Sequence, residues 1–421
     1  METRIGIIPL PVYVLLVAIV GYFTAVGKLP ADISMVMAVM ALFGFTCGEL
    51  GKHIPVLRHL GAAAIFATFI PSFFVYRHWL PRDVVRTVTE FTKTSNFLYL
   101  FIAAIIVGSI FGMDRRVLIR GFLKIFIPMT IGSILAAVVG TAVGAGLGLG
   151  ARHTFLFIVI PVLAGGVGEG ASPLSTGYAQ IMHQGQSDLF AQVLPPVMFG
   201  SLTAILFSGA LNFLGKKFPQ WTGRGRLQPE GDDELGPLQG GSTDRVDVGH
   251  IAAAGITAIS LYLVGLVCFR AWGWPAADVM LFVAVGVKLA RAVSPQLQEG
   301  AYVVYRFFAT AVTYPLLFAI GVALTPWDKL LDAFALRNLV TIVATVATMT
   351  VTGFFVGRWI KLFPIDMAIV NSCRCGQGGT GDVAILTASD RMALMPFAQV
   401  ATRIGGGLTV ILGLLAYAKM R

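Results

Sequence analysis

Residues 372–389 read SCRCGQGGTGDVAILTAS, and residues 160–175 read IPVLAGGVGEGASPLS. In each stretch an apolar segment is broken by several glycines, which precede one acidic residue, Asp382 or Glu169. A helix broken inside a membrane exposes N–H and C=O groups, and this is tolerated only where the break is buried in protein or lines a watery cavity. The two stretches therefore predict two re-entrant hairpins, at about 154–182 and about 364–389, whose glycine tips meet near the middle of the membrane.

The rest of the chain has the composition of a membrane protein. Hydrophobic residues make up 56% of its 421 residues and charged residues only 12%, whereas about 25% of the residues in a soluble domain are charged. Apolar segments long enough to cross about 30 Å of hydrocarbon recur along the chain. We expect transmembrane helices at 7–27, 31–48, 59–78, 96–113, 121–149, 188–214, 250–270, 275–291, 303–325, 337–360 and 393–418. The predicted fold class is an all-α membrane protein with eleven transmembrane helices and two re-entrant hairpins.

The distribution of charge predicts the orientation. Lys and Arg are more frequent in the segments that lie inside when the N-terminus is cytoplasmic, which places the C-terminus outside. Residues 82–93 are predicted to form an amphipathic helix at the outer interface. The net charge of +10 is explained by these inner loops, so we expect no nucleic-acid partner.

Enzymatic and metal-binding functions have little support in the sequence. The four cysteines, Cys47, Cys268, Cys373 and Cys375, form neither a disulfide framework nor a zinc-ligand pattern. No H-E-x-x-H helix and no nucleophile with a nearby base is found at membrane depth. An intramembrane enzyme is thus a remote alternative, and we expect no cofactor.

An internal repeat divides the chain. Asp114 precedes Gly165 by 51 positions, Asp328 precedes Gly378 by 50, and the sequence FAQV follows each glycine motif, at 190–193 and 397–400. Each copy has five spans, and because this number is odd the second copy enters the membrane from the opposite side. Such an inverted repeat is common in secondary transporters. The expected organisation is an extra N-terminal helix at 1–28, a first repeat at 29–214, a flexible cytoplasmic linker at 215–249 and a second repeat at 250–421.

The hairpins and the last span predict a site for an anion and cations. Helix N-termini after the glycines can bind a carboxylate, and unwound carbonyls can bind Na+. Arg403 lies within the last span, where an arginine indicates a functional site, although an internal salt bridge with Glu169 or Asp382 is an alternative. Thr402 offers a hydroxyl to sodium or substrate. Glu169 and Asp382 are candidate ion ligands, proton carriers or helix-cap partners, and the glycines alone could serve helix packing.

The paired glycine motifs, the closing FAQVATRIGG at 397–406 and the arrangement of one extra helix plus two sets of five resemble the bacterial 2-hydroxycarboxylate transporter family. The resemblance implies a homodimer in the inner membrane, in lipid, with a static dimerisation domain and a mobile transport domain that moves like an elevator. It implies sodium-coupled symport of citrate or malate. Proton coupling, or exchange of malate or citrate with lactate, is the alternative.

The resemblance also assigns site residues. The implied substrate contacts are Val167, Gly168, Gln377, Gly379, Thr380 and Arg403. The implied sodium contacts are Val162, Gly165, Val167, Cys373, Arg374, Gly376 and Thr402. Citrate carriers of the family have Asn where Val167 stands and Arg where Gln377 stands. One buried arginine is then left for the three carboxylates of citrate, so either Arg374 compensates or a dicarboxylate such as malate becomes the more plausible substrate, with citrate still possible.

Overall fold

The structure is a computed structural model that describes residues 3–27, 29–54, 62–112, 115–166, 170–183, 185–228, 247–272, 276–325, 327 and 335–419. Nearly all of these residues are helical, as predicted. Two short antiparallel strands, β1 (Arg4–Ile5) and β2 (Ile8–Pro9), precede the first helix.

The helices of the first half are α1 (Leu10–Val26), α2 (Ile33–His53), α3 (Ala62–Tyr76), α4 (Arg82–Thr94), α5 (Phe97–Gly112), α6 (Arg115–Gly146), α7 (Ala151–Thr154), α8 (Ile160–Leu163), α9 (Ser172–Met182) and α10 (Gln186–Lys217). A π-helical turn (Phe155–Val159) joins α7 to α8. The second half contains α11 (Val248–Trp272), α12 (Ala276–Leu289), α13 (Pro295–Phe307), α14 (Thr313–Leu324), α16 (Leu336–Trp359), α17 (Pro364–Cys373), α18 (Gly379–Ser389) and α19 (Met395–Lys419). A second π-helical turn (Phe308–Val312) joins α13 to α14, and short 3-10 turns lie at Pro219–Trp221 and Met392–Leu394.

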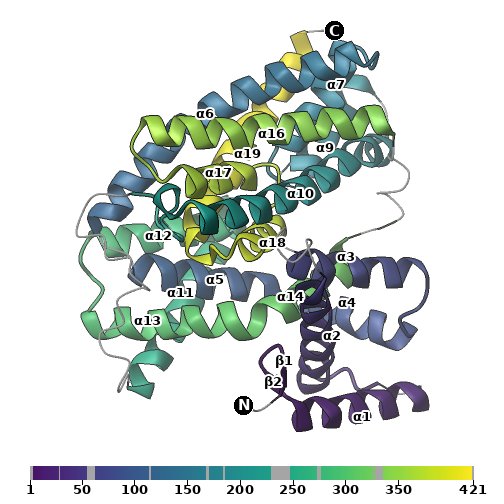
Figure 1. Ribbon diagram of the computed structural model, residues 1–421, viewed down its shortest axis with the longest axis vertical. Coiled ribbons are helices and arrows are strands. Elements are labelled where there is room, and N and C mark those ends of the chain that lie inside the picture. Colours follow the sequence, from purple (N-terminus) through teal and green to yellow (C-terminus); the bar gives the residue numbers. More distant parts are fainter. Residues whose placement is uncertain are drawn as a thin grey trace.

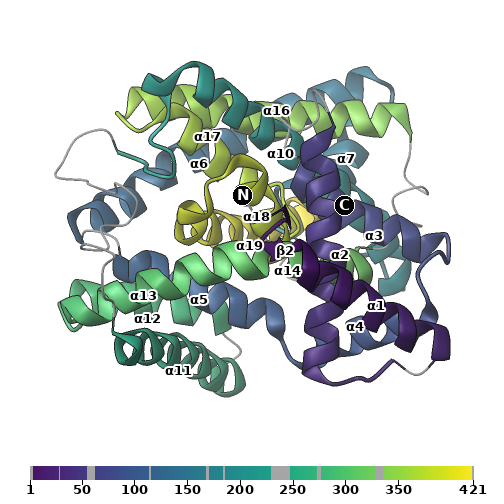
Figure 2. The same cartoon turned by 60° about the horizontal axis from the view of Figure 1, so that its bottom comes forward.

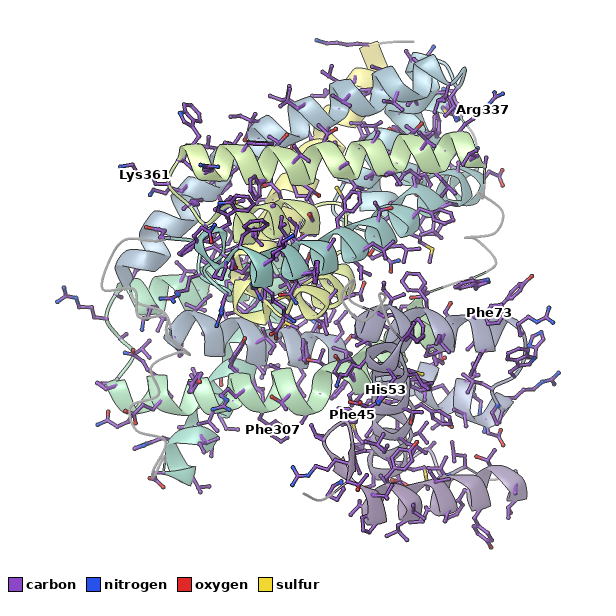
Figure 3. All side chains as sticks on the ribbon, in the orientation of Figure 1. Phe45, His53, Phe73, Phe307, Arg337 and Lys361 are labelled. Carbon is purple, nitrogen blue, oxygen red and sulfur yellow. The ribbon has the colours of Figure 1, made fainter. Side chains whose placement is uncertain are left out.

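The lengths and composition of these helices are those of a multi-pass membrane protein. Among the described residues, seven helices are long and apolar enough to cross a membrane, or eight if α4 and α5, bent by 53°, are one span. The predicted spans at 7–27, 59–78 and 275–291 coincide with the shorter apolar helices α1, α3 and α12. Large apolar side chains such as Val267, Phe355 and Trp359 are exposed, as lipid-facing residues would be. Figure 3 shows Arg337 and Lys361 at the two ends of α16, so the charges flank its apolar length.

The helices form two bundles (Figures 1 and 2). In the first, which we name the hairpin bundle, α6 to α10 pack with α16 to α19, and α16 lies along both α6 and α17. In the second, the facing bundle, α1 to α5 pack with α11 to α14, and α14 lies against α2 and α3. Each half of the sequence therefore contributes to both bundles.

Both glycine motifs form helix–loop–helix units within the hairpin bundle. The first runs from α7 through α8 to α9, and the second consists of α17 and α18. Gly165, Gly166 and Gly378 have positive φ angles of 78°, 136° and 74°, which side chains other than glycine rarely adopt. A Cβ on Gly166 would collide with the backbone of Gly378, so the two tips are in contact.

The start of the predicted linker is folded, which the sequence did not predict. After α10, residues 218–228 turn back onto the base of the second hairpin, where the Phe363 N–H donates to the Leu227 carbonyl at 2.7 Å. The Asp366 carboxylate accepts hydrogen bonds from Thr222 Oγ1 and the Gly223 and Gly225 N–H groups at 2.7–2.8 Å. A buried carboxylate is stable only with such donors. These hydrogen bonds hold residues 222–225 against the second hairpin. Residues 229–246 lie outside the described residues.

Candidate functional site

A cavity of about 340 Å³ lies where the tip of the second hairpin faces the other bundle. The cavity is lined by Thr92, Lys93, Asn96, Leu98, Tyr99, Ile102, Leu324, Gln377, Gly379, Thr380 and Arg403. Four of the six residues predicted to bind substrate, Gln377, Gly379, Thr380 and Arg403, are thus brought together at one cavity. The other two, Val167 and Gly168, and the acidic Glu169 lie outside the described residues.

The N-terminus of α18 forms one wall of this cavity. Gly378 ends the loop with φ 74° and ψ −147°, and α18 begins at Gly379. The Thr380 hydroxyl donates to the Gln377 carbonyl at 2.9 Å, which stabilises the turn into the helix. The first N–H groups of a helix have no partner within the helix, and its dipole favours an anion there. This wall can therefore bind a carboxylate.

Arg403 supplies the buried positive charge of the cavity. Its side chain extends from α19, and the residue is only 8% exposed. Its Nε–H donates to Gln399 Oε1 at 2.8 Å. One terminal nitrogen, Nη2, lies 3.9 Å from the position that a Cβ on Gly379 would occupy. The guanidinium and the N-terminus of α18 thus face the same space, where one carboxylate can contact both.

Gln399 links this guanidinium to a buried acid. Its Nε2 donates to Asp382 Oδ2 at 2.7 Å, and Thr402 Oγ1 lies 2.9 Å from Asp382 Oδ1. Asp382 is fully buried. Our sequence analysis did not name Gln399 as a site residue, although it stands four positions before Arg403 and hence on the same helical face. The anion site and a candidate cation site are therefore joined by one amide side chain.

Most residues predicted to contact sodium gather where the hairpins meet α19. A Cβ on Gly165 would collide with the Thr402 carbonyl, and the Cys373 carbonyl accepts from the Gly376 N–H at 2.9 Å and from Thr402 Oγ1 at 3.3 Å. Val162 is buried in α8, where its side chain faces Gly200 of α10. Val167 lies outside the described residues.

Arg374 is not among the described residues that line the cavity, so its position does not support the expectation that it compensates for the missing second arginine. Its Nη1 donates to Ser133 Oγ at 2.7 Å, and its Nη2 donates to the carbonyls of Leu163 and Gly405 at 3.1 and 2.7 Å and to Thr409 Oγ1. A buried guanidinium requires acceptors, and the carbonyl at the end of α8, a carbonyl within α19 and two hydroxyl groups provide them. Arg374 therefore ties the second hairpin to α6, α8 and α19.

A second cavity, of about 720 Å³, lies at the opposite end of α18 and also separates the two bundles. Leu386, Thr387 and Asp390 line it from the end of the second hairpin. Its basic residues come from both bundles and from residues 223–226, and they are Arg224, Arg226, Arg306 and Arg391. Hence α18, 11 residues long, has an open space at each end.

Comparison with known proteins gives one consistent result. The model of the 2-hydroxycarboxylate transporter family matches residues 5–415. The chain is 54% identical over 416 residues to a citrate/malate-proton symporter of Bacillus subtilis, covering 99% of this chain and 92% of the relative. It is 37% identical to a Na+-malate symporter of the same organism (97% and 91% covered). It is 26% identical to a citrate/sodium symporter of Salmonella typhimurium (98% and 94% covered).

Proposed function

Because the chain belongs to the 2-hydroxycarboxylate transporter family, we propose that it is a secondary symporter that carries malate or citrate across the bacterial inner membrane together with a cation. The observation that carries this proposal is the cavity at the hairpin tip, which pairs the buried Arg403 with the N-terminus of α18. The family and the relatives named above are transporters, so the chain is not an enzyme.

The substrate is proposed to bind with one carboxylate on Arg403. A guanidinium can donate two parallel hydrogen bonds to a carboxylate, and the first turn of α18 at Gly379 can donate to the same group. Gln377 and Thr380 line the cavity beside it, and their polar side chains suit a substrate hydroxyl. Val167 and Gly168 are proposed to complete the contact from the first hairpin.

The coupling cation is proposed to bind at the junction of the hairpins with α19. Sodium is the first candidate, with Val162, Gly165, Val167, Cys373, Arg374 and Gly376 contributing backbone oxygens and Thr402 its hydroxyl. A proton on Asp382 is the second candidate. Asp382 is buried and bonded to Gln399 and Thr402, and a relative with 54% identity is a proton symporter.

The proposed architecture has eleven transmembrane helices, two re-entrant hairpins and an inverted repeat of 29–214 and 250–421. Residues 1–28 form the added helix and 215–249 the cytoplasmic linker. Helices of 10 or 11 residues such as α17 and α18 rise about 15–17 Å, about half of the hydrocarbon thickness. They can enter the membrane from one side and return. The N-terminus is proposed to be cytoplasmic and the C-terminus periplasmic.

We further propose an elevator movement within a homodimer, in which the hairpin bundle is the transport domain and the facing bundle the dimerisation domain. The cavities at the two ends of α18 support this proposal, because both lie between the bundles. A displacement of one bundle along the other would open the hairpin tip first to one side and then to the other.

The decisive experiment measures uptake of labelled malate and citrate by proteoliposomes, with a sodium gradient or a pH gradient imposed separately. Arg403→Ala should lower uptake at least about 30-fold, since losing one partner of a buried charge contact costs 2 kcal/mol or more. Arg403→Lys keeps the positive charge but cannot donate two parallel hydrogen bonds to a carboxylate, so this variant should retain part of the uptake. Normal uptake by folded Arg403→Ala protein would refute the site. The gradient that drives uptake identifies the ion.

A further inference from the structure

The cavity at the hairpin tip contains a second positive charge that neither hairpin provides. Among the described residues that line it, Arg403 and Lys93 are the two cations, and none is acidic. Lys93 lies in the last turn of α4, within the facing bundle, and its side chain is exposed. Because Arg374 is turned away and bonded to Ser133 and backbone carbonyls, Lys93 is the lining cation that remains for a second carboxylate.

The break between α4 and α5 brings this lysine to the cavity. The two helices are bent by 53°, and Asn96, between them, has a positive φ of 50°. This bend brings Thr92 and Lys93 of α4, Asn96 at the break and Tyr99 of α5 to the cavity. The cavity thus has the tip of the second hairpin on one wall and the α4–α5 corner on the opposite wall.

We propose that Lys93 binds the distal carboxylate of the substrate and makes the site selective for dicarboxylates. This inference rests on the proposed function and adds a contact from the facing bundle. Arg403 takes the first carboxylate and Lys93 the second, so the two cations of the cavity match the two charges of a malate-type dianion. A third carboxylate finds no third cation among the lining residues that the structure describes.

The contact of Lys93 with substrate depends on the position of the bundles. Arg403 and Gly379 belong to the hairpin bundle, whereas Lys93 belongs to the facing bundle. When one bundle moves past the other, Lys93 separates from the hairpin tip. Lys93 therefore strengthens binding only from the side of the membrane on which α4 lies, which is the predicted outer side.

A structural role of Lys93 predicts a different result. A cation in the last turn of a helix interacts favourably with the helix dipole, so loss of the Lys93 charge could destabilise α4. Such a loss would weaken the binding of every substrate, from either side of the membrane. Arg86 provides a matched control on the same helix, because it is exposed, pairs with Asp83 at 3.6 Å and does not line the cavity.

The test compares Lys93→Gln, Lys93→Arg and Arg86→Gln in right-side-out and inside-out membrane vesicles. Lys93→Gln should raise the malate KM about tenfold in right-side-out vesicles, as the loss of one partly solvated charge contact implies. The KM in inside-out vesicles should change less than about twofold. Inhibition of malate uptake by lactate, which has one carboxylate, should weaken far less than inhibition by a second dicarboxylate. Lys93→Arg should restore the affinity.

Two outcomes would overturn the inference. One is an equal rise in KM from both sides, or an equal loss of lactate and dicarboxylate binding, which would indicate a structural role. The other is an unchanged outer KM in Lys93→Gln, as expected for Arg86→Gln. Failure of the proposed function is distinguishable, because the wild-type protein would then transport no hydroxycarboxylate in either vesicle type.

Discussion

The two hairpins share a sequence pattern, but their described tip residues differ in what they contact. The second hairpin lines it with Gln377, Gly379 and Thr380. The described tip residues of the first hairpin contact protein instead, Gly165 against Thr402 and Gly166 against Gly378. Gly165 and Gly166 of the first hairpin thus support the second hairpin, whose helix N-terminus faces the cavity. Glycines at matching places of a repeated motif can therefore make different contacts.

The hairpins are also anchored by different chemistry. At the base of the second, the Asp366 carboxylate lies 3.2 Å from Arg391 Nε and accepts from Thr222, Gly223 and Gly225. At the base of the first, the Tyr178 ring packs between Phe157 and Tyr417 with centroid distances of 5.4 and 4.9 Å. A directional polar anchor thus fixes the second hairpin, whereas the first hairpin is held mainly by aromatic packing.

The contact between the tips gives the largest effect on uptake expected from this comparison. Gly166→Ala should lower uptake more than about tenfold, because a positive φ of 136° strains any side chain by about 1–3 kcal/mol and its Cβ would displace Gly378. Gly378→Ala should have a loss of similar size. Gly407→Ala, in α19 with nothing near its Cβ position, is the control for uptake and folding. Normal uptake by Gly166→Ala would show that the tips act independently.

The elements that sequence could predict are those with a local signal. The length of the apolar segments predicted the helices, and the runs of glycine predicted the breaks at Gly165 and Gly378. Helices and breaks both depend on residues that are adjacent in the chain. The sequence also singled out Arg403, because an arginine inside an apolar span is costly, and the structure places it at the cavity.

The remaining features depend on contacts between distant segments. Arg374 has the same residue type as Arg403, but its direction depends on carbonyls at Leu163 and Gly405. Lys93 was assigned to an interfacial helix, and only the packing of α4 and α5 against the hairpin bundle brings it to the cavity. The fold of 218–228 likewise depends on Asp366, more than 130 positions later. No local pattern marks these pairings.

The polar anchor of the second hairpin should have a smaller effect on uptake, and its main effect should be on stability. Asp366→Asn leaves Arg391 buried without its partner charge, which costs about 3–5 kcal/mol. The unfolding temperature in detergent should fall clearly. The control Asp83→Asn removes an exposed pair worth at most about 1 kcal/mol. Because Asp366 does not line the cavity, the malate KM should stay within about twofold. A large rise in KM without loss of stability would move Asp366 into the binding machinery.

The aromatic anchor of the first hairpin should have the smallest effect. Tyr178 donates its hydroxyl hydrogen bond to the Leu156 carbonyl at 3.0 Å, and Tyr178→Phe removes that bond but keeps the ring between Phe157 and Tyr417. The cost should be about 1 kcal/mol, the net value of one neutral hydrogen bond, and Tyr22→Phe on an exposed face is the control. The Tyr178→Phe protein should therefore unfold at a higher temperature than the Asp366→Asn protein. The reverse order would mean that the first hairpin depends on its hydroxyl rather than on its ring, and the two anchors would then be chemically alike.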